Sequence, residues 1–125
     1  MIYESGEMYL ETILILSKSQ PEVHAVDVAT EMGISKASVS RAMGRLRSEA
    51  CIIIDQAGRI AFTEKGRTIA EKIYERHTVL TELLTSLGVS PETAAADACR
   101  MEHDISDETF SCIKAHRDKM SRKEK

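Results

Sequence analysis

The chain of 125 residues is 42% hydrophobic and 30% charged, with a formal net charge of −3. This composition suits one compact domain, or two small lobes with an aliphatic core, and excludes collagen-like and Pro/Gly-rich disordered chains. No apolar run approaches the roughly 18 residues of a membrane span, the N-terminus lacks the basic start of a signal peptide, and three cysteines form no disulfide framework, so a cytoplasmic protein is expected.

The first fifty residues predict three helices. Ser5 is expected to cap the first helix, whose apolar positions recur at helical spacing until the Ser17–Pro21 stretch ends it. A second helix is predicted over Val26–Met32, with Gly33 as its C-terminal stop. Ser35 is the predicted N-cap of a third helix. The buried stripe of that third helix is Val39, Met43 and Leu46. Two helices joined by a tight Gly-containing turn are typical of a helix-turn-helix.

A β-hairpin and a long helix follow. The β-branched runs at 51–55 and 59–62 flank a Gly-containing turn, and a hairpin after a helix-turn-helix is the winged-helix arrangement. A long helix is expected over 63–87, in which Gly66 is a mild conflict with helix propensity. Ser90 before Pro91 predicts a further helix over 91–104, and a last helix is expected from residue 106.

The distribution of charge points to the third helix as a nucleic-acid contact. Residues 32–76 carry nine basic and five acidic side chains (+4), residues 1–31 one and six (−5), and residues 77–108 one and seven (−6). A basic island in an acidic chain indicates nucleic-acid binding. The alternative is a solvated face of a structural bundle, but the hairpin that follows favours DNA. The expected DNA-binding residues are Ser35, Lys36, Ala37, Ser38, Ser40, Arg41, Arg45 and Arg59.

Three potential metal ligands lie near the end of the helix expected over 91–104. Cys99, Glu102 and His103 are spaced i, i+3 and i+4, which places a thiolate, a carboxylate and an imidazole on one helical face. Three ligand types at this spacing favour a metal site. The alternative is a small core cysteine beside a solvated Glu-His edge.

The first helix offers a possible complement to those ligands. Met8 and Glu11 share a helical face, although a methionine is most often a core filler and an exposed glutamate is common. His77 is a lone imidazole in the long helix, whose default interpretation is a satisfied or exposed histidine.

No enzyme is expected. The sequence contains no Gly-rich phosphate loop, no HExxH motif and no supported Ser/His/Asp arrangement. An open-site metal hydrolase is the only catalytic alternative that the ligand types leave.

Five stretches of the sequence resemble the DtxR/MntR family of metal-dependent transcriptional repressors. They are Glu7-Met-Tyr-Leu-Glu-Thr-Ile13, the helix-turn-helix, Thr63-Glu-Lys-Gly-Arg67, Glu75-Arg-His77 and Ala98-Cys-Arg-Met-Glu-His103, in family order from Ser5 to about Ile113. The resemblance implies a mostly α fold, with an N-terminal winged helix-turn-helix (1–72) followed by a helical metal-binding and dimerisation domain (73–125). It also implies a homodimer on a palindromic double-stranded DNA operator, with no membrane and no small-molecule substrate as partner.

The resemblance assigns the metal ligands residue by residue. The matches to the primary site of the iron-responsive branch are Met8, Cys99, Glu102 and His103. Glu11 and His77 match ligands of the manganese-responsive branch. Ala95 and Thr81 replace ancillary ligands of the iron branch, and the SH3-like third domain of that branch is not found in the sequence. The chain therefore resembles a short two-domain form with an iron-type primary site.

The donor set bears on the metal and on the mechanism. Thioether and thiolate are soft donors that favour Fe(II), Co(II), Ni(II) or Zn(II) over Mn(II). Family likeness then implies Fe(II), with Mn(II) as the alternative and the other three ions as substitutes in vitro. The implied function is repression of metal-uptake genes, in which the metal bridges the DNA-binding and dimerisation lobes. Two alternatives remain open: a metal-independent winged-helix regulator, and a metal-binding interaction module without DNA binding.

Overall fold

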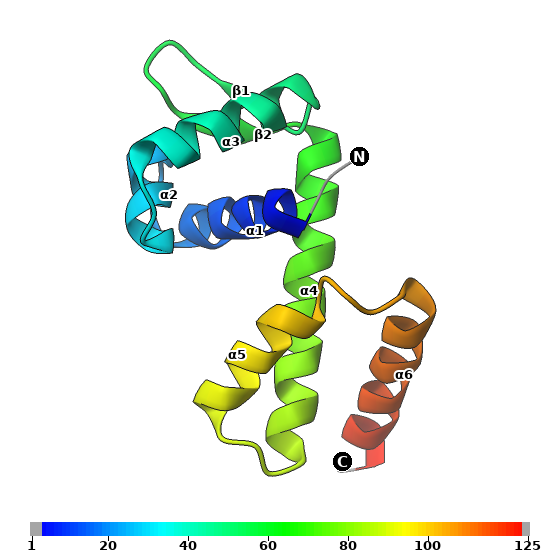
Figure 1. Cartoon of the computed structure of the whole chain (residues 1–125). Helices are drawn as coiled ribbons and strands as arrows, with labels where there is room; N and C mark the ends of the chain where they lie inside the picture. Colours follow the sequence, from blue (N-terminus) through cyan, green and yellow to red (C-terminus); the bar gives the residue numbers. More distant parts are fainter. Residues whose placement is uncertain (1–3, 124–125) are drawn as a thin grey trace. The chain divides into compact units, whose positions relative to one another are not determined.

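The computed structural model describes residues 4–123, with side chains described for residues 6–120. The described chain is mostly helical and divides between Lys72 and Ile73 into two compact units (Figure 1). The mostly α fold with an N-terminal helix-turn-helix and hairpin, predicted from the sequence, is confirmed. None of the described helices is both long enough and apolar enough to cross a bilayer.

The first unit packs three helices and a hairpin around an aliphatic core. Its elements are α1 (Glu4–Ser19), α2 (Ala25–Met32), α3 (Lys36–Ser48), β1 (Ile52–Ile54), β2 (Ile60–Phe62) and residues 64–72 of α4 (Glu64–Ser86). α1 begins one residue before the cap predicted at Ser5, and α2 begins one residue before Val26. Its core includes Leu10, Ile13, Val28, Val39, Met43, Leu46, Ile52 and Ile60. The predicted apolar stripe of α3 is therefore confirmed.

The turn between α2 and α3 forms as the sequence predicts. Gly33 has a φ of 67°, in the left-handed region where a glycine carries no steric cost. Ser35 follows in an extended conformation, and its Oγ accepts a hydrogen bond from the backbone N–H of Ser38 at 3.1 Å. This bond satisfies one of the unpaired N–H groups at the start of α3 and fixes where the helix begins.

The hairpin is short and is attached to the loop before α2. β1 and β2 pair in antiparallel register, and Gly58 occupies the turn with a φ of 85°. The Asp55 carboxylate accepts hydrogen bonds from the backbone N–H groups of Ala57 and Arg59, each at 2.9 Å. The N–H of Ile60 donates to the carbonyl of Val23 at 2.8 Å, so the α1–α2 loop holds the hairpin.

The start of α4 explains why a glycine occupies position 66. The hydroxyl of Thr63 accepts from the N–H of Gly66 at 3.1 Å and donates to the carbonyl of Ala50 at 2.6 Å. A Cβ on Gly66 would lie 1.8 Å from the carbonyl oxygen of Cys51. Close approach of two backbones therefore requires glycine here and outweighs its low helix propensity.

The second unit contains the rest of α4, α5 (Pro91–Met101) and α6 (Asp107–Lys123). α4 ends at Ser86 rather than Leu87, and the Oγ of Ser106 accepts from the N–H of Thr109 at 3.1 Å as α6 begins. α5 ends at Met101, three residues before the end expected at about Asp104, and a turn follows. Its buried apolar residues include Ile73, Val79, Leu80, Ala94, Ala98 and Phe110.

Candidate metal centre and nucleic-acid interface

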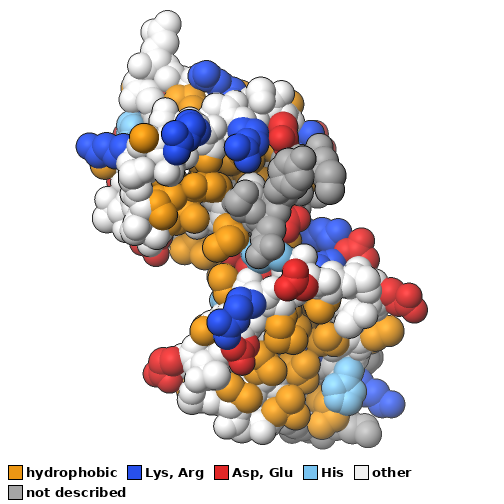
Figure 2. All heavy atoms as spheres, viewed as in Figure 1, with side chains coloured by type: hydrophobic (Ala, Val, Ile, Leu, Met, Phe, Trp, Pro, Cys, Tyr) orange, Lys and Arg blue, Asp and Glu red, His pale blue; other side chains and the backbone are white. Residues whose placement is uncertain are grey.

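The outer face of α3 concentrates basic side chains. Val39, Met43 and Leu46 are buried, so the helical repeat turns the other positions outward. No acidic residue occurs between Met32 and Ser48. Figure 2 shows Lys and Arg side chains spread over the visible face of the first unit. The exposed residues of this face include Ser35, Lys36, Ala37, Ser40, Arg41, Arg45 and Arg47.

Ser38 is the one expected DNA contact on α3 that is only half-exposed. Its hydroxyl accepts from the Ser35 hydroxyl at 3.0 Å and from Nη2 of Arg41 at 3.5 Å. The first turn of α3 thus presents small side chains bonded to one another beside an exposed guanidinium. Short side chains at a helix N-terminus let the backbone approach the floor of a DNA groove, and arginine can reach a base edge or a phosphate.

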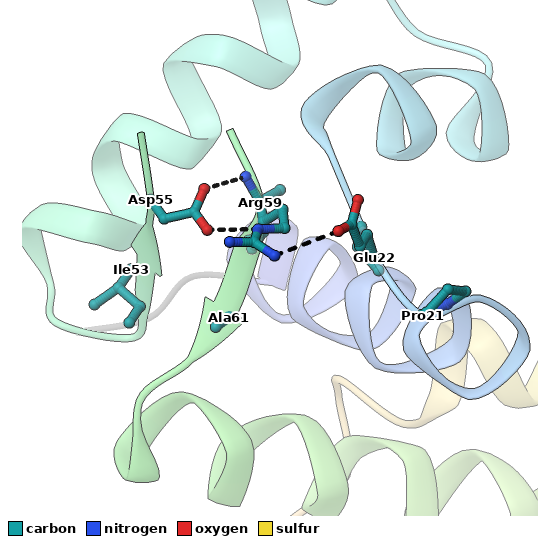
Figure 3. A pocket seen from close by; sticks show the side chains of 8 residues that line it. Pro21, Glu22, Ile53, Asp55, Arg59 and Ala61 are labelled. Carbon is teal, nitrogen blue, oxygen red and sulfur yellow. Dashed lines mark hydrogen bonds and ion pairs between the residues drawn. The ribbon is translucent and has the colours of Figure 1, made fainter. Parts of the chain in front are cut away.

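Arg59 differs from the α3 cations because two carboxylates hold it (Figure 3). Its Nε donates to Oδ2 of Asp55 at 2.6 Å, and its Nη1 lies 3.3 Å from Oε1 of Glu22. Hydrogen bonds from the Arg59 backbone and side chain hold the pKa of Asp55 below its usual range. The sequence predicted Arg59 as a DNA contact on the hairpin. The structure places the guanidinium on the hairpin but balances its charge.

In the second unit, two imidazoles converge on one buried carboxylate. Nδ1 of His77 lies 3.0 Å from Oε2 of Glu102, and Nε2 of His103 lies 3.3 Å from Oε1 of the same residue. The side chains of Glu102 and His103 are 0% and 1% exposed. Burial of a carboxylate is costly unless opposite charge or a cation compensates it. A carboxylate and two imidazoles in contact are a donor set that divalent transition ions accept, so these residues fit a metal.

Cys99 lies on α5 and is half-buried. In the part of the chain that the structure describes, no set of three His, Cys or acidic ligand atoms within 4.8 Å of one another includes Cys99 or His103. α5 ends at Met101, but Glu102 keeps a helical backbone with φ −60° and ψ −24°, and its N–H donates to the carbonyl of Ala98 at 2.9 Å, whereas His103 lies in the turn that follows. The shared helical face of Cys99, Glu102 and His103 stays a prediction.

Of the other two cysteines, Cys51 is a packing residue and Cys112 lies at the surface. Cys51 is fully buried, and this burial raises the pKa of its thiol. Cys112 is exposed on α6. No disulfide joins any of the three cysteines.

The first unit contributes two candidate ligands from α1. Met8 is half-buried and Glu11 is buried, one helical turn further along. The carbonyl of Met8 accepts from the hydroxyl of Thr12 at 2.9 Å within the same helix. A thioether and a carboxylate one turn apart present their donor atoms on one side of a helix.

Sequence reasoning missed Arg76, which is buried beside the His77–Glu102 pair. Arg76 follows the core residue Ile73 at i+3 and precedes Leu80 at i+4, so it occupies an inward position of α4. A charged residue at an inward helical position was the available signal.

Known protein families match both units of the chain. The family model "Iron dependent repressor, N-terminal DNA binding domain" matches residues 1–55, and "Iron dependent repressor, metal binding and dimerisation domain" matches residues 63–124. The transcriptional regulator MntR of Escherichia coli O6:H1 is 34% identical over 106 residues, covering 85% of this chain and 68% of the relative. An uncharacterized HTH-type transcriptional regulator of Methanocaldococcus jannaschii is 30% identical over 122 residues, covering 96% and 98%.

Solved structures show the same fold. A manganese-dependent transcriptional repressor in complex with manganese is 25% identical with a TM-score of 0.83, and the match covers 90% of this chain and 52% of that one. The chain thus spans about half the length of that repressor. The chain belongs to the DtxR/MntR family of metal-dependent transcriptional repressors, which are DNA-binding regulators and not enzymes.

Proposed function

We propose that this chain is a divalent-metal-dependent repressor of metal-uptake genes, in which bound metal permits operator binding. The observation that carries the proposal is the buried Glu102 carboxylate in contact with the imidazoles of His77 and His103. Burial of that carboxylate is unfavourable without compensating positive charge, and residues 77–108 are acidic overall, with one basic and seven acidic side chains. A bound divalent cation compensates this charge and stabilises one arrangement of the ligands.

The proposed ligands come from both units. Glu102, His103, Cys99 and His77 belong to the second unit, and α1 of the first unit supplies Met8 and Glu11. A metal that takes ligands from both would bridge the DNA-binding lobe and the dimerisation lobe, residues 1–72 and 73–125. A preference of a few kcal/mol for the bridged arrangement is sufficient to switch operator occupancy.

Fe(II) is the proposed physiological metal, because the thioether of Met8 and the thiolate of Cys99 are soft donors. Mn(II) is the second candidate, and a specific observation favours it. The ligands in closest contact are the oxygen and nitrogen donors of Glu102 and His77, a pair that does not need a soft metal. The relatives named MntR and the repressor solved with manganese support the same candidate.

The proposed DNA complex is a homodimer on a palindromic operator. One winged helix contacts few base pairs, so two recognition helices are needed for useful specificity. The second unit offers an apolar surface for self-association. Leu87 and Met120 are 71% and 46% exposed and line a shallow pocket between the ends of α4 and α6.

The experiment is anaerobic DNA selection followed by titration. A random-sequence duplex pool is enriched on the full chain with Fe(II), and again with Mn(II), and the selected duplex is then titrated with each divalent metal and with chelator. We expect binding that requires metal and is lost on chelation. Equal binding with chelator would establish a metal-independent regulator. Metal uptake without enrichment of any duplex would establish an interaction module instead.

A further inference from the structure

We propose that Arg76 is a positioning residue that holds the turn carrying Glu102 and His103 in the geometry that metal requires. The inference rests on the proposed function only for the role of those two ligands. The contacts of Arg76 itself lie within the second unit.

One guanidinium ties together the end of α5, the following turn and the start of α6. Nη1 of Arg76 donates to the backbone carbonyls of Glu102 at 3.1 Å and Ile105 at 2.8 Å. Nη2 donates to Oδ1 of Asp107. The guanidinium carbon lies 5.3 Å from the centre of the Phe110 ring, and the Arg76 side chain is 7% exposed. Only arginine offers several donors in a planar fork that can reach such a set.

These contacts replace hydrogen bonds that the helix itself does not supply. A helix leaves its last carbonyls without intrahelical partners, and buried carbonyls need a donor. Arg76 provides that donor at Glu102 and again three residues later at Ile105. Arg76 thereby holds the turn after Met101 to α4 at both of its ends.

Consecutive residues of α4 hold opposite ends of the same ligand. His77 contacts the Glu102 carboxylate, and Arg76 contacts the Glu102 carbonyl. Glu102 is therefore anchored to α4 at its backbone and at its side chain, and His103 follows it directly. A metal site depends on residues that orient its ligands, and loss of such a residue typically weakens metal affinity about 10–100-fold.

A purely structural role would lower the stability of the apo protein without a specific effect on metal. The test therefore compares Arg76→Lys and Arg76→Met with Lys114→Met in the full chain. Lys114 contacts Glu75 at 2.9 Å and joins the same two helices, α4 and α6, away from the turn. Asp107→Asn is the gentler variant, because it keeps both carbonyl contacts and weakens only the third.

The readouts are anaerobic Co(II) titration followed by absorption, thermal unfolding of the apo protein, and amide hydrogen exchange. The amides of Asp104 and Ile105 bond to the carbonyl of Met101 at 3.0 and 3.2 Å, so their exchange reports on the turn. We expect both Arg76 variants to bind Co(II) about 10–100-fold more weakly, with an altered band and faster exchange at those amides. Asp107→Asn should show a smaller change in the same direction, and Lys114→Met none.

Two results would overturn the proposal. One is wild-type Co(II) affinity and spectrum in Arg76→Lys and Asp107→Asn, the variants chosen to stay folded if Arg76→Met does not. The other is weaker metal binding in Lys114→Met by the same factor, which would show that any contact between α4 and α6 suffices. If the wild-type chain takes up no Co(II), the proposed function fails by itself. In that case unchanged exchange at Asp104 and Ile105 in Arg76→Lys would refute the anchoring of the turn separately.

Discussion

The charged side chains of α3 are exposed to solvent, whereas the carboxylate of Glu102 is buried against His77 and His103. α3 exposes Lys36, Arg41 and Arg45 to solvent with no acid among them. The second unit instead buries a carboxylate against two imidazoles, next to a buried arginine. Solvated charges contribute little to stability and remain available to a partner, whereas buried charges are sensitive to every contact around them. Substitution of the exposed α3 cations should therefore change DNA binding alone, and substitutions near Glu102 should change metal binding and folding stability together.

The largest expected effect is on metal binding in Glu102→Gln. The amide keeps the shape of the side chain but removes the negative charge that both imidazoles face, so we expect metal affinity to fall more than about 100-fold. Anaerobic titration with Fe(II) and Co(II) measures this loss. The matched control is Glu82→Gln, an exposed acid of α4 that pairs with Arg117. Retention of wild-type affinity in Glu102→Gln would remove the central ligand from the proposal.

The next largest effects are expected at the two sulfur ligands, Cys99 and Met8. Cys99→Ala should abolish metal-dependent DNA binding because it removes an anionic ligand, and Met8→Ala should weaken the metal response more mildly. Met8→Asp should shift preference toward Mn(II), a harder ion. Cys112→Ala is the control, since that thiol is exposed on α6. A thiolate-to-Co(II) charge-transfer band that persists in Cys99→Ala would show that a different cysteine binds the metal.

In the first unit, position 66 has no room for a side chain. Gly66→Ala should destabilise the protein by about 3 kcal/mol or more, since its Cβ would overlap the Cys51 carbonyl. Gly44→Ala, on α3 with open space around its Cβ, should instead stabilise by about 0.5–1 kcal/mol. Urea denaturation of both variants is the measurement. Equal stabilities would contradict the backbone contact at Gly66.

On the α3 surface, Arg41→Ala and Arg45→Ala should each weaken the free energy of DNA binding by about 1–3 kcal/mol. Their unfolding free energies should change by less than about 0.5 kcal/mol, because both side chains are exposed. Fluorescence anisotropy with the selected duplex, alongside denaturation, checks both values. Lys119→Ala, an exposed cation of α6, is the control for net charge. Unchanged DNA affinity in both variants would exclude α3 as the recognition helix.

The smallest expected effect is at Arg59, whose charge Asp55 and Glu22 already balance. Arg59→Met should weaken DNA binding less than either α3 variant, and it should raise the pKa of Asp55 toward its usual range. Because the folded hairpin lowers this pKa, its contribution to stability is present above pH about 4 and is lost as pH falls further. An NMR titration of the Asp55 carboxyl compares the variant with the wild type. A pKa that does not move would contradict the ion pair.

Local patterns were enough to predict much of the first unit. Gly33 and Ser35 act through their own backbone conformation and their nearest neighbours, so the turn of the helix-turn-helix could be found from the sequence. The contact of the Glu102 carbonyl at the end of α5 with Arg76 could not be found in this way, because the two residues are 26 positions apart. The pairing of Arg59 with Glu22 across 37 residues is hidden from local patterns in the same way.

For the proposed metal ligands, too, part of the site could be predicted from the sequence and part could not. Their chemistry and their resemblance to a family were visible in the sequence, because residue type and order are enough for both. The contact between His77 and Glu102 required the packing of α5 against α4, since the two residues are 25 positions apart. Gly66 was a conflict by propensity and is explained only by a backbone that arrives from residue 51.

The burial of Cys51 also sets an order of chemical reactivity along the chain. Thiol reagents attack the thiolate, and burial both raises the pKa of the Cys51 thiol and blocks access to it. Cys112 is exposed on α6, so a maleimide applied to the native protein reaches it before Cys51. A fluorophore can therefore be attached to the second unit through the native side chain of Cys112. Cys51, between α3 and β1, reacts only after the first unit unfolds, so the onset of its reactivity marks unfolding.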